Sequence, residues 1–203
     1  MHAQKQSRRA LFTRLAAAAL ALSFAGHAFA AENPQVAIKT TMGDIVVELD
    51  AEHAPKSTAN FMQYVKSGFY KGTVFHRVID GFMIQAGGYT EKLIDKPGVR
   101  KPIASESKNG LSNKPYTLAM ARTADPNSAS SQFFINVNDN AGLDYPGQDG
   151  TGYTVFGRVV QGQETVDKIK AVMVDDMRGM QNVPVTPIVI RSTTVLTGEK
   201  RIQ

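Results

Sequence analysis

The stretch from residue 74 to residue 88, VFHRVIDGFMIQAGG, places one charged side chain inside an apolar strand pattern. Arg77 stands among Phe, Val, Ile and Met, and a second apolar run ends at Gln85 and two glycines. Burying a guanidinium among apolar groups is costly unless the charge is paired or used. Arg77 is therefore the first candidate for chemistry in this chain.

Metal binding and nucleophilic catalysis find little support in the residue types. There is no cysteine, and only His53 and His76 follow residue 30, which falls short of any zinc spacing. Strand alternation predicts that His76 points away from whatever Arg77 serves. Ser105 and Lys108 fit an S-x-x-K pattern, the nucleophile motif of penicillin-recognising enzymes, but no S-D-N or K-T-G follows. Such a hydrolase is a distant alternative, and we expect no metal and no cofactor.

An arginine with apolar and amide neighbours, and without a nucleophile or an acid–base pair, suits a reaction that breaks no σ bond. Rotation about a prolyl peptide bond is such a reaction, and its barrier of roughly 18–20 kcal/mol comes from amide resonance. A guanidinium that hydrogen-bonds the proline nitrogen or a nearby carbonyl during the twist would stabilise the transition state selectively. Apolar side chains would hold the proline ring, and Gln or backbone groups would hold the flanking peptide.

Two periodicities predict the elements that must position these groups. Period-two runs indicate about eight strands, of which the first two form a hairpin around Met42-Gly43. Helical spacing predicts one helix that begins at Pro55 and a second at about residues 163–172. Because there is no regular βαβ alternation, we expect a mainly β fold, a closed eight-stranded antiparallel barrel capped by two α-helices.

Three segments without strand or helix periodicity are expected to be loops, at residues 90–113, 138–152 and 175–184. Long loops in compact domains are often functional. In the strand expected at 132–137, alternation places Phe133 and Ile135 on one face and Gln132 and Phe134 on the other.

Residues 1–30 match the three-part plan of an export signal. A basic start, MHAQKQSRR, leads into an apolar run that ends in the cleavage pattern Ala28-Phe29-Ala30. We predict a cleavable signal peptide at 1–30 and a single domain at 31–203, with its core at about 36–196 and a short loose C-terminal tail. Export by the Sec or the twin-arginine route would place the protein in the periplasm.

The formal net charge of +5 comes mainly from the predicted export signal, and the domain contributes only about +1. Four of the 23 Lys and Arg residues precede residue 31, which leaves 19 basic against 18 acidic residues. A nearly balanced domain argues against a nucleic-acid partner. The apolar run is too Ala-rich and interrupted for a membrane span, so we expect no membrane contact after cleavage. Nothing in the sequence indicates more than a monomer.

Two long motifs resemble the signatures of the cyclophilin-type peptidyl-prolyl cis-trans isomerases. FHRVIDGFMIQAGG is similar to the active-site signature, and LAMARTADPNSASSQFFINV to the second signature. YTVFGRVVQGQETVDKI resembles the strand and helix that follow, so the resemblance covers about residues 36–196. The exported, periplasmic bacterial members are the most similar. The resemblance implies X-Pro isomerisation that assists the folding of exported proteins, with proline-containing unfolded or partly folded polypeptides as partners.

The resemblance carries the family's site residues onto this chain one at a time. Arg77 falls on the catalytic arginine, and Gln85 falls on the glutamine that binds the substrate backbone. The proline pocket falls on four apolar residues, Phe82, Met83, Phe134 and Leu143.

The remaining positions of the groove are polar or small. A strip that contacts the residues before proline falls on Ala121, Arg122 and Thr123, and most eukaryotic relatives carry Asn where Arg122 stands. Gln132 falls on another groove residue, and Tyr153 takes the place of a pocket histidine.

Gly142 departs from the family, because eukaryotic members often carry at this position a tryptophan that contacts cyclosporin. A large aromatic contact contributes substantially to binding, so we expect weak cyclosporin binding with isomerase activity retained. An alternative of another class is a cyclophilin-fold peptide-binding chaperone whose isomerase activity is incidental. Loss of Arg77 or Gln85 would favour that alternative, and both residues are present.

Overall fold

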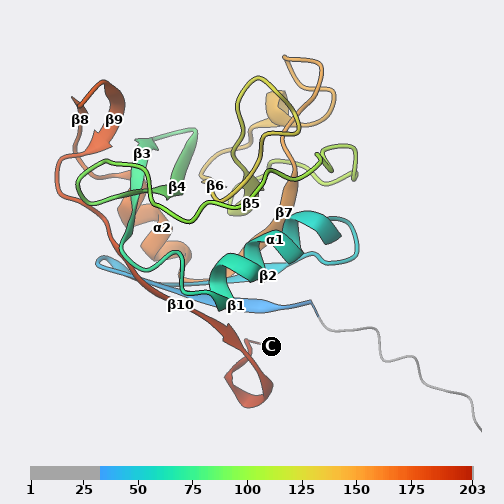
Figure 1. The fold of residues 1–203 in the computed structure, drawn as a ribbon, viewed down its shortest axis with the longest axis horizontal. Helices are drawn as coiled ribbons and strands as arrows, with labels where there is room; N and C mark the ends of the chain where they lie inside the picture. The colour runs from blue at the N-terminus through green and yellow to red at the C-terminus, as the bar shows by residue number, and fades with distance from the viewer. Residues whose placement is uncertain (1–32, 203) are drawn as a thin grey trace, which may run out of the picture. The chain divides into compact units, whose positions relative to one another are not determined.

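An eight-stranded antiparallel sheet forms the centre of the fold in the computed structural model, which describes residues 33–202 (Figure 1). In spatial order its strands are β10 (Ile190–Leu196), β1 (Gln35–Thr40), β2 (Gly43–Leu49), β7 (Val155–Gln161), β5 (Thr117–Met120), β6 (Phe133–Asn136), β4 (Met83–Thr90) and β3 (Thr73–Ile79). The signal peptide predicted at 1–30 lies outside the described residues. No helix within residues 33–202 is both long enough and apolar enough to cross a membrane.

The two end strands of this sheet, β10 and β3, meet without forming a ladder. Val74 and Val189 make an isolated bridge, and the Phe75 N–H donates to the Ile188 carbonyl at 3.0 Å. The expectation of a closed barrel is therefore wrong, and the sheet is an open half-barrel. The chain that enters β10 contains Pro187, which has no N–H to donate, so a regular ladder cannot extend along β3.

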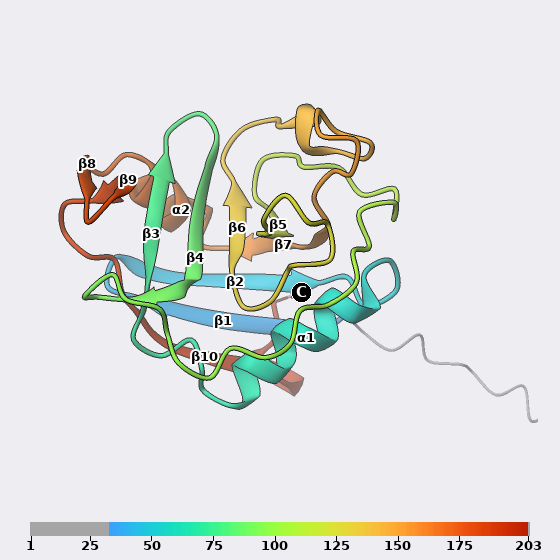
Figure 2. The same ribbon diagram turned by 45° about the horizontal axis from the view of Figure 1, so that its top comes forward.

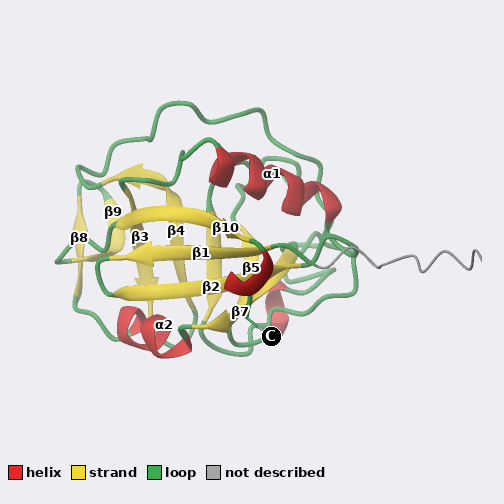
Figure 3. Cartoon of the chain, turned by 90° about the horizontal axis from the view of Figure 1, so that it is seen from below, coloured by secondary structure: helices red, strands yellow, loops and turns green. Residues whose placement is uncertain are grey.

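Two helices pack beside the strands, as the sequence predicts. They are α1 (Pro55–Lys66), with its proline in the first turn, and α2 (Gln163–Lys170). Figure 3 shows them on opposite sides of the strands. Phe61 of α1 reaches the core, where its ring centroid lies 5.4 Å from that of Phe133 and 5.5 Å from that of Phe156.

Hydrophobic side chains divide into two clusters, one on each face of the central strands. Phe133 and Ile135 of β6 belong to the main core, together with the buried face of α1. Phe134, between them in the chain, belongs to a smaller cluster with Met83, Ala119 and Val155. The period-two separation predicted for β6 is confirmed, and the smaller cluster marks the face that carries the candidate site.

Residues 175–184, expected to be a loop, form most of a hairpin that the sequence did not predict. Its strands are β8 (Val174–Met177) and β9 (Met180–Pro184), and Figure 2 shows them beside β3. Arg178 and Gly179 make the turn with φ values of 51° and 77°. Positive φ at both turn residues suits a tight hairpin, but Arg-Gly signals it less clearly than Asn-Gly does.

The C-terminal segment is held in place up to Ile202, so the prediction of a loose tail is wrong there. The Gln35 side chain donates to the Ile202 carbonyl at 2.9 Å and accepts from its N–H at 2.8 Å. A short 3₁₀ turn at Gly198–Lys200 directs the chain back toward β1. The buried amide of Gln35, 2% exposed, therefore acts as a clamp on this segment.

The long loop between β4 and β5 caps the start of α1. Glu106 accepts the N–H groups of Lys56 and Ser57, each at 2.8 Å, and the Ser57 hydroxyl at 2.8 Å. The residue before the helix is Ala54, which has no side chain able to cap. A carboxylate from fifty residues further along the chain thus satisfies the unpaired N–H groups of the first turn.

Candidate active site

Nine of the eleven predicted site residues line one cavity of about 280 Å³. Strands β3, β4 and β6 supply some of them, and the others lie just before β4, just after β5 and in the loop before β7. The lining consists of Arg77, Phe82, Met83, Gln85, Ala121, Arg122, Phe134, Leu143 and Tyr153. Segments more than fifty residues apart in the chain meet here because β3, β4, β6 and β5 are neighbours in the sheet.

Strand register sets the order of the groups across this cavity. Arg77 of β3 lies opposite Gln85 of β4, and Gln85 lies opposite Phe134 of β6. Phe134 in turn lies opposite Ala119 of β5. Directly paired residues point to the same face with their Cβ atoms about 5 Å apart. The guanidinium, the amide and the aromatic ring therefore form one row along the surface of the sheet.

The apolar part of the cavity is an aromatic and aliphatic pocket. Met83 and Phe134 form its floor and are 2% and 4% exposed. The Tyr153 ring packs edge-on against Phe134, with the centroids 5.8 Å apart. Phe82 and Leu143 pack against the same cluster and are only partly buried. Such a pocket offers a small ring both a flat surface and apolar walls.

The guanidinium of Arg77 is available to a ligand. Arg77 is half-buried, and the described part of the chain offers its guanidinium no hydrogen-bond or ion-pair partner. A half-buried charge without a partner is costly. The polar group that would satisfy it must come from outside the chain, in line with the role that the sequence predicts for Arg77.

Arg122, the second guanidinium of the lining, is bonded to groups of the protein itself. Its side chain is 4% exposed, and its Nε and Nη2 donate to the Gly152 carbonyl at 3.0 Å and 2.7 Å. Nη2 also donates to the Thr151 hydroxyl at 2.8 Å and pairs with Asp149. Arg122 therefore holds the wall of the cavity through contacts within the protein.

A buried amide network positions Phe82 and the turn that carries Leu143. Asn136 is fully buried, and its side-chain oxygen Oδ1 accepts from Asn140 Nδ2 at 2.7 Å. Asn140 Nδ2 also donates to the Phe82 carbonyl at 2.8 Å, while the Asn140 carbonyl accepts from Leu143 N–H at 2.8 Å. One residue, Asn140, thus holds two walls of the pocket, Phe82 through its side chain and Leu143 through its backbone carbonyl. No sequence pattern indicated this network, because it joins β6 to two turns.

Two predicted site residues lie outside this cavity. Gln132 lies at its margin, where its Oε1 accepts from Gln85 Nε2 at 2.8 Å. Thr123 lies on the exposed turn beyond β5 and bonds Ser128 through its hydroxyl and its N–H, each at 2.9 Å. The structure therefore groups Gln132 with Gln85 and separates Thr123 from the pocket.

The expectation that His76 points away from the surroundings of Arg77 is wrong. Both side chains line a further cavity that adjoins the first. Strict alternation fails because the register of β3 against β4 shifts between Phe75 and Arg77, which marks a bulge. His76 is 5% exposed, and its burial lowers its pKa to about 4. The imidazole is therefore neutral at neutral pH.

Neither alternative chemistry is assembled among residues 33–202. Ser105 Oγ donates to Ser107 Oγ at 3.2 Å, while Lys108 Nζ lies 4.7 Å from the centroid of the Tyr145 ring. Lys108 is thus not hydrogen-bonded to Ser105. Within the described residues, no group of three His, Cys, Asp or Glu side chains is arranged to hold a metal ion.

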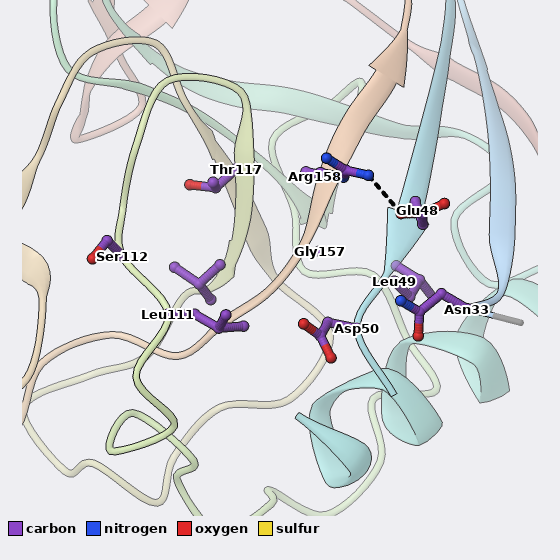
Figure 4. A pocket seen from close by; sticks show the side chains of 10 residues that line it. Asn33, Glu48, Leu49, Asp50, Leu111, Ser112, Thr117, Gly157 and Arg158 are labelled. Carbon is purple, nitrogen blue, oxygen red and sulfur yellow. Dashed lines mark hydrogen bonds and ion pairs between the residues drawn. The ribbon is translucent and has the colours of Figure 1, made fainter. Parts of the chain in front are cut away.

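A separate cavity of about 330 Å³ lies between β2, β5 and β7 (Figure 4). Its charged groups are already paired, since Arg158 donates to Glu48 at 3.0 Å and Asp50 accepts from His53 at 2.9 Å. It shares no lining residue with the cavity of Arg77. The cavity of Arg77 is therefore the one that carries the predicted site residues.

Comparison with known proteins agrees with the geometry. Residues 35–195 match the family model for the cyclophilin type peptidyl-prolyl cis-trans isomerase. The chain is 53% identical over 163 residues to the peptidyl-prolyl cis-trans isomerase cyp18 of Streptomyces antibioticus, covering 79% of this chain and 98% of the relative. It is 48% identical over 178 residues to the peptidyl-prolyl cis-trans isomerase A of Dickeya dadantii, covering 87% and 93%.

A solved structure shows the same likeness at lower identity. The crystal structure of a cyclophilin type peptidyl-prolyl cis-trans isomerase of Cryptosporidium parvum, in the presence of the dipeptide Ala-Pro, superposes with a TM-score of 0.67 at 28% identity. The superposition covers 81% of this chain and 99% of that structure.

Proposed function

Because this chain belongs to the cyclophilin-type peptidyl-prolyl cis-trans isomerase family, we propose that the cavity of Arg77 is where it rotates the X-Pro bond. The family carries the activity, and the assignment of residues within the cavity is ours. One observation carries the proposal: the unpartnered guanidinium of Arg77 stands at the edge of an apolar pocket, in register with Gln85.

Two kinds of group would hold the bound peptide, an apolar pocket and a side-chain amide. The pocket of Phe82, Met83, Phe134 and Leu143 would hold the proline ring and so fix one side of the bond. Gln85 Nε2 is bound to Gln132, which leaves the Gln85 carbonyl oxygen to accept an N–H of the substrate backbone. With both sides held, the bound peptide needs only to turn about one bond.

Arg77 would act on the twisting amide itself. Rotation removes resonance, so the proline nitrogen becomes pyramidal and gains a lone pair that can accept a hydrogen bond. A guanidinium donates to that lone pair in the twisted state and much less in the planar states. Interaction confined to the transition state raises the rate without shifting the equilibrium.

The test compares wild type with Arg77→Ala and Arg77→Lys in an isomerisation assay on a short X-Pro peptide. We expect kcat/KM to fall by at least about a hundredfold in Arg77→Ala, as for other lost transition-state donors, with circular dichroism unchanged. Arg191→Ala, at an exposed position of β10, is the matched control and should retain wild-type activity. An unchanged rate in Arg77→Ala would remove Arg77 from the mechanism.

We further propose that the enzyme is exported to the periplasm and assists the folding of proline-containing exported polypeptides. The basic start, apolar run and A-x-A pattern of residues 1–30 support this location. N-terminal sequencing of the protein from a periplasmic fraction should begin at Ala31. Replacing Arg8 and Arg9 with Lys should block export only if the twin-arginine route is used. A full-length protein in the cytosolic fraction would contradict the proposal.

Two further properties belong to this proposal. We expect a monomer, which light scattering of the purified domain would measure directly. We also expect weak cyclosporin inhibition, because Gly142 offers no aromatic surface beside the pocket.

A further inference from the structure

A second cavity, of about 440 Å³, adjoins the proline pocket and shares Arg77 and Gln85 with it. From these two residues it extends to the β8–β9 hairpin. The remaining lining is His76, Tyr89, Gln132, Gly179, Met180 and Gln181. A peptide bound at Arg77 would therefore have this cavity directly beside it, and the residue types of the lining indicate what fits.

The hairpin holds its side of the cavity in place. Val183 of β9 is 3% exposed, and β9 packs along β3. The tight turn at Arg178-Gly179 fixes where the strand after it begins, and Gln181 follows one residue later with its side chain exposed to solvent. The base of the hairpin is thus packed against the domain, and the short turn at its tip holds Gln181 beside the cavity.

Arg77 carries the only formal charge of the lining at neutral pH. His76 is neutral because its burial lowers its pKa to about 4, with the guanidinium of Arg77 acting in the same direction. Its ring packs edge-on against Tyr89, with the centroids 4.7 Å apart. No carboxylate lines the cavity, so a positively charged ligand group would meet Arg77 without a compensating acid.

Hydrogen-bond donors converge on the same space. Gln85 Nε2 donates to Gln132 Oε1 at 2.8 Å, which orients the Gln132 amide and leaves its amino group as a donor. Gly88 permits this arrangement, because a Cβ at that position would lie 2.5 Å from the Gln132 amide. The Gln181 amide and the guanidinium of Arg77 add further donors.

We propose that this cavity is a substrate subsite that accepts the side chain of a residue flanking the proline, and that it selects carboxylate and carboxamide side chains over cationic ones. Glu or Gln on the substrate would accept hydrogen bonds from the amide donors, whereas Lys or Arg would be repelled by Arg77. The proposal rests on the isomerase activity and adds a sequence preference to it.

The test measures kcat/KM for X-Pro peptides in which the residue before or after the proline is Ala, Leu, Gln, Glu or Lys. At one of the two positions we expect Glu and Gln to exceed Lys by roughly fivefold, the upper end of what a partly exposed charge contact supports. Gln181→Glu places a carboxylate in the cavity and should reduce the Glu-to-Lys ratio by roughly the same factor. Gln161→Glu, an exposed position on β7, is the control and should leave the ratio unchanged.

A measurement on the wild type alone supports the same conclusion without relying on a variant. In molar salt the preference for Glu over Lys should shrink, because exposed charge contacts are screened, while that for Gln over Leu should persist. A flat or Leu-favouring profile at both positions would overturn the subsite, as would an unchanged ratio in Gln181→Glu. Absence of turnover on the Ala peptide would instead overturn the isomerase assignment, and the subsite with it.

Discussion

The guanidinium carbon of Arg122 lies 4.1 Å from the centroid of the Tyr153 ring. This cation–π contact joins the end of β5 to the loop before β7. The Tyr153 ring in turn packs edge-on against Phe134, with the centroids 5.8 Å apart. Asp149 completes the arrangement, because its ion pair with Arg122 holds the pKa of the Asp149 carboxyl well below its ordinary value. One wall of the proline pocket is therefore held by a nearly buried arginine that is bonded within the protein.

Replacing Arg122 should consequently loosen the pocket without removing a catalytic group. In Arg122→Ala the segment 149–153 loses several hydrogen bonds and the stack on Tyr153, worth together about 2 kcal/mol of unfolding free energy. We expect KM to rise several-fold and kcat to change little, as steady-state kinetics and thermal unfolding would show. Arg122→Lys should restore little, since an ammonium cannot make the forked contacts. A fall in kcat with KM unchanged would mean that Arg122 acts on the reacting bond.

The cap of α1 makes a second prediction, on stability alone. Glu106→Ala leaves the N–H groups of Lys56 and Ser57 without their acceptor, which should lower the unfolding free energy by about 2 kcal/mol. Glu106→Gln should fall between wild type and Ala, because the amide keeps one acceptor oxygen. Denaturant unfolding measures both variants, with Glu91→Ala as the control at an exposed position of the same loop. Equal stabilities of Glu106→Gln and wild type would contradict a role for the second oxygen.

Local pattern explains why the sequence predicted most of the site. Alternation on β6 separates Phe133 from Phe134 whatever the rest of the chain does, and the structure confirms it. The two motifs carry seven of the nine lining residues because each spans a strand and the turn that adjoins it. Short-range features of this kind depend on backbone geometry over a few residues, which the sequence determines directly.

Features that depend on distant pairings were not predictable in the same way. The bulge in β3 that brings His76 beside Arg77 arises from pairing with β4, and no residue in the stretch signals it. Glu106 reaches α1 only because the loop is folded back across the domain. Barrel closure likewise depends on how β10 meets β3, where Pro187 interrupts the ladder. The last two of these misses involve partners fifty or more residues apart, and the bulge depends on the register between two strands.

Gly142 offers a direct test of the missing aromatic surface. It stands on the 3₁₀ turn at Ala141–Leu143, and a Cβ there would meet only the flexible end of Gln148, at 3.0 Å. Gly142→Trp should therefore be tolerated and should tighten cyclosporin inhibition by roughly tenfold or more, since a large aromatic contact is worth that much. Gly142→Ala is the control, because it adds a Cβ at this position without adding an aromatic ring. Equal inhibition constants for the Trp and Ala variants would contradict the explanation.

His76 predicts how stability depends on pH. In the folded protein its pKa is about 4, chiefly through burial, against 6.5 in the unfolded chain. Between these values the unfolded state binds the proton and the folded state does not, so the stabilisation present above pH 6.5 is lost as the pH falls toward 4. The loss should approach about 3 kcal/mol of unfolding free energy. Denaturant unfolding across this range would measure it.

The matching variants separate His76 from the other histidine of the domain. His76→Phe should remove this part of the pH dependence, because a buried ring remains and no proton is bound. His53→Gln should have the opposite effect on the pH dependence of the unfolding free energy. Asp50 raises the pKa of His53, so protonated His53 favours the folded state at low pH, and the variant loses that stabilisation. If His76→Phe leaves the slope between pH 4 and 6.5 as it is in the wild type, then the imidazole is not the group that takes up the proton on unfolding.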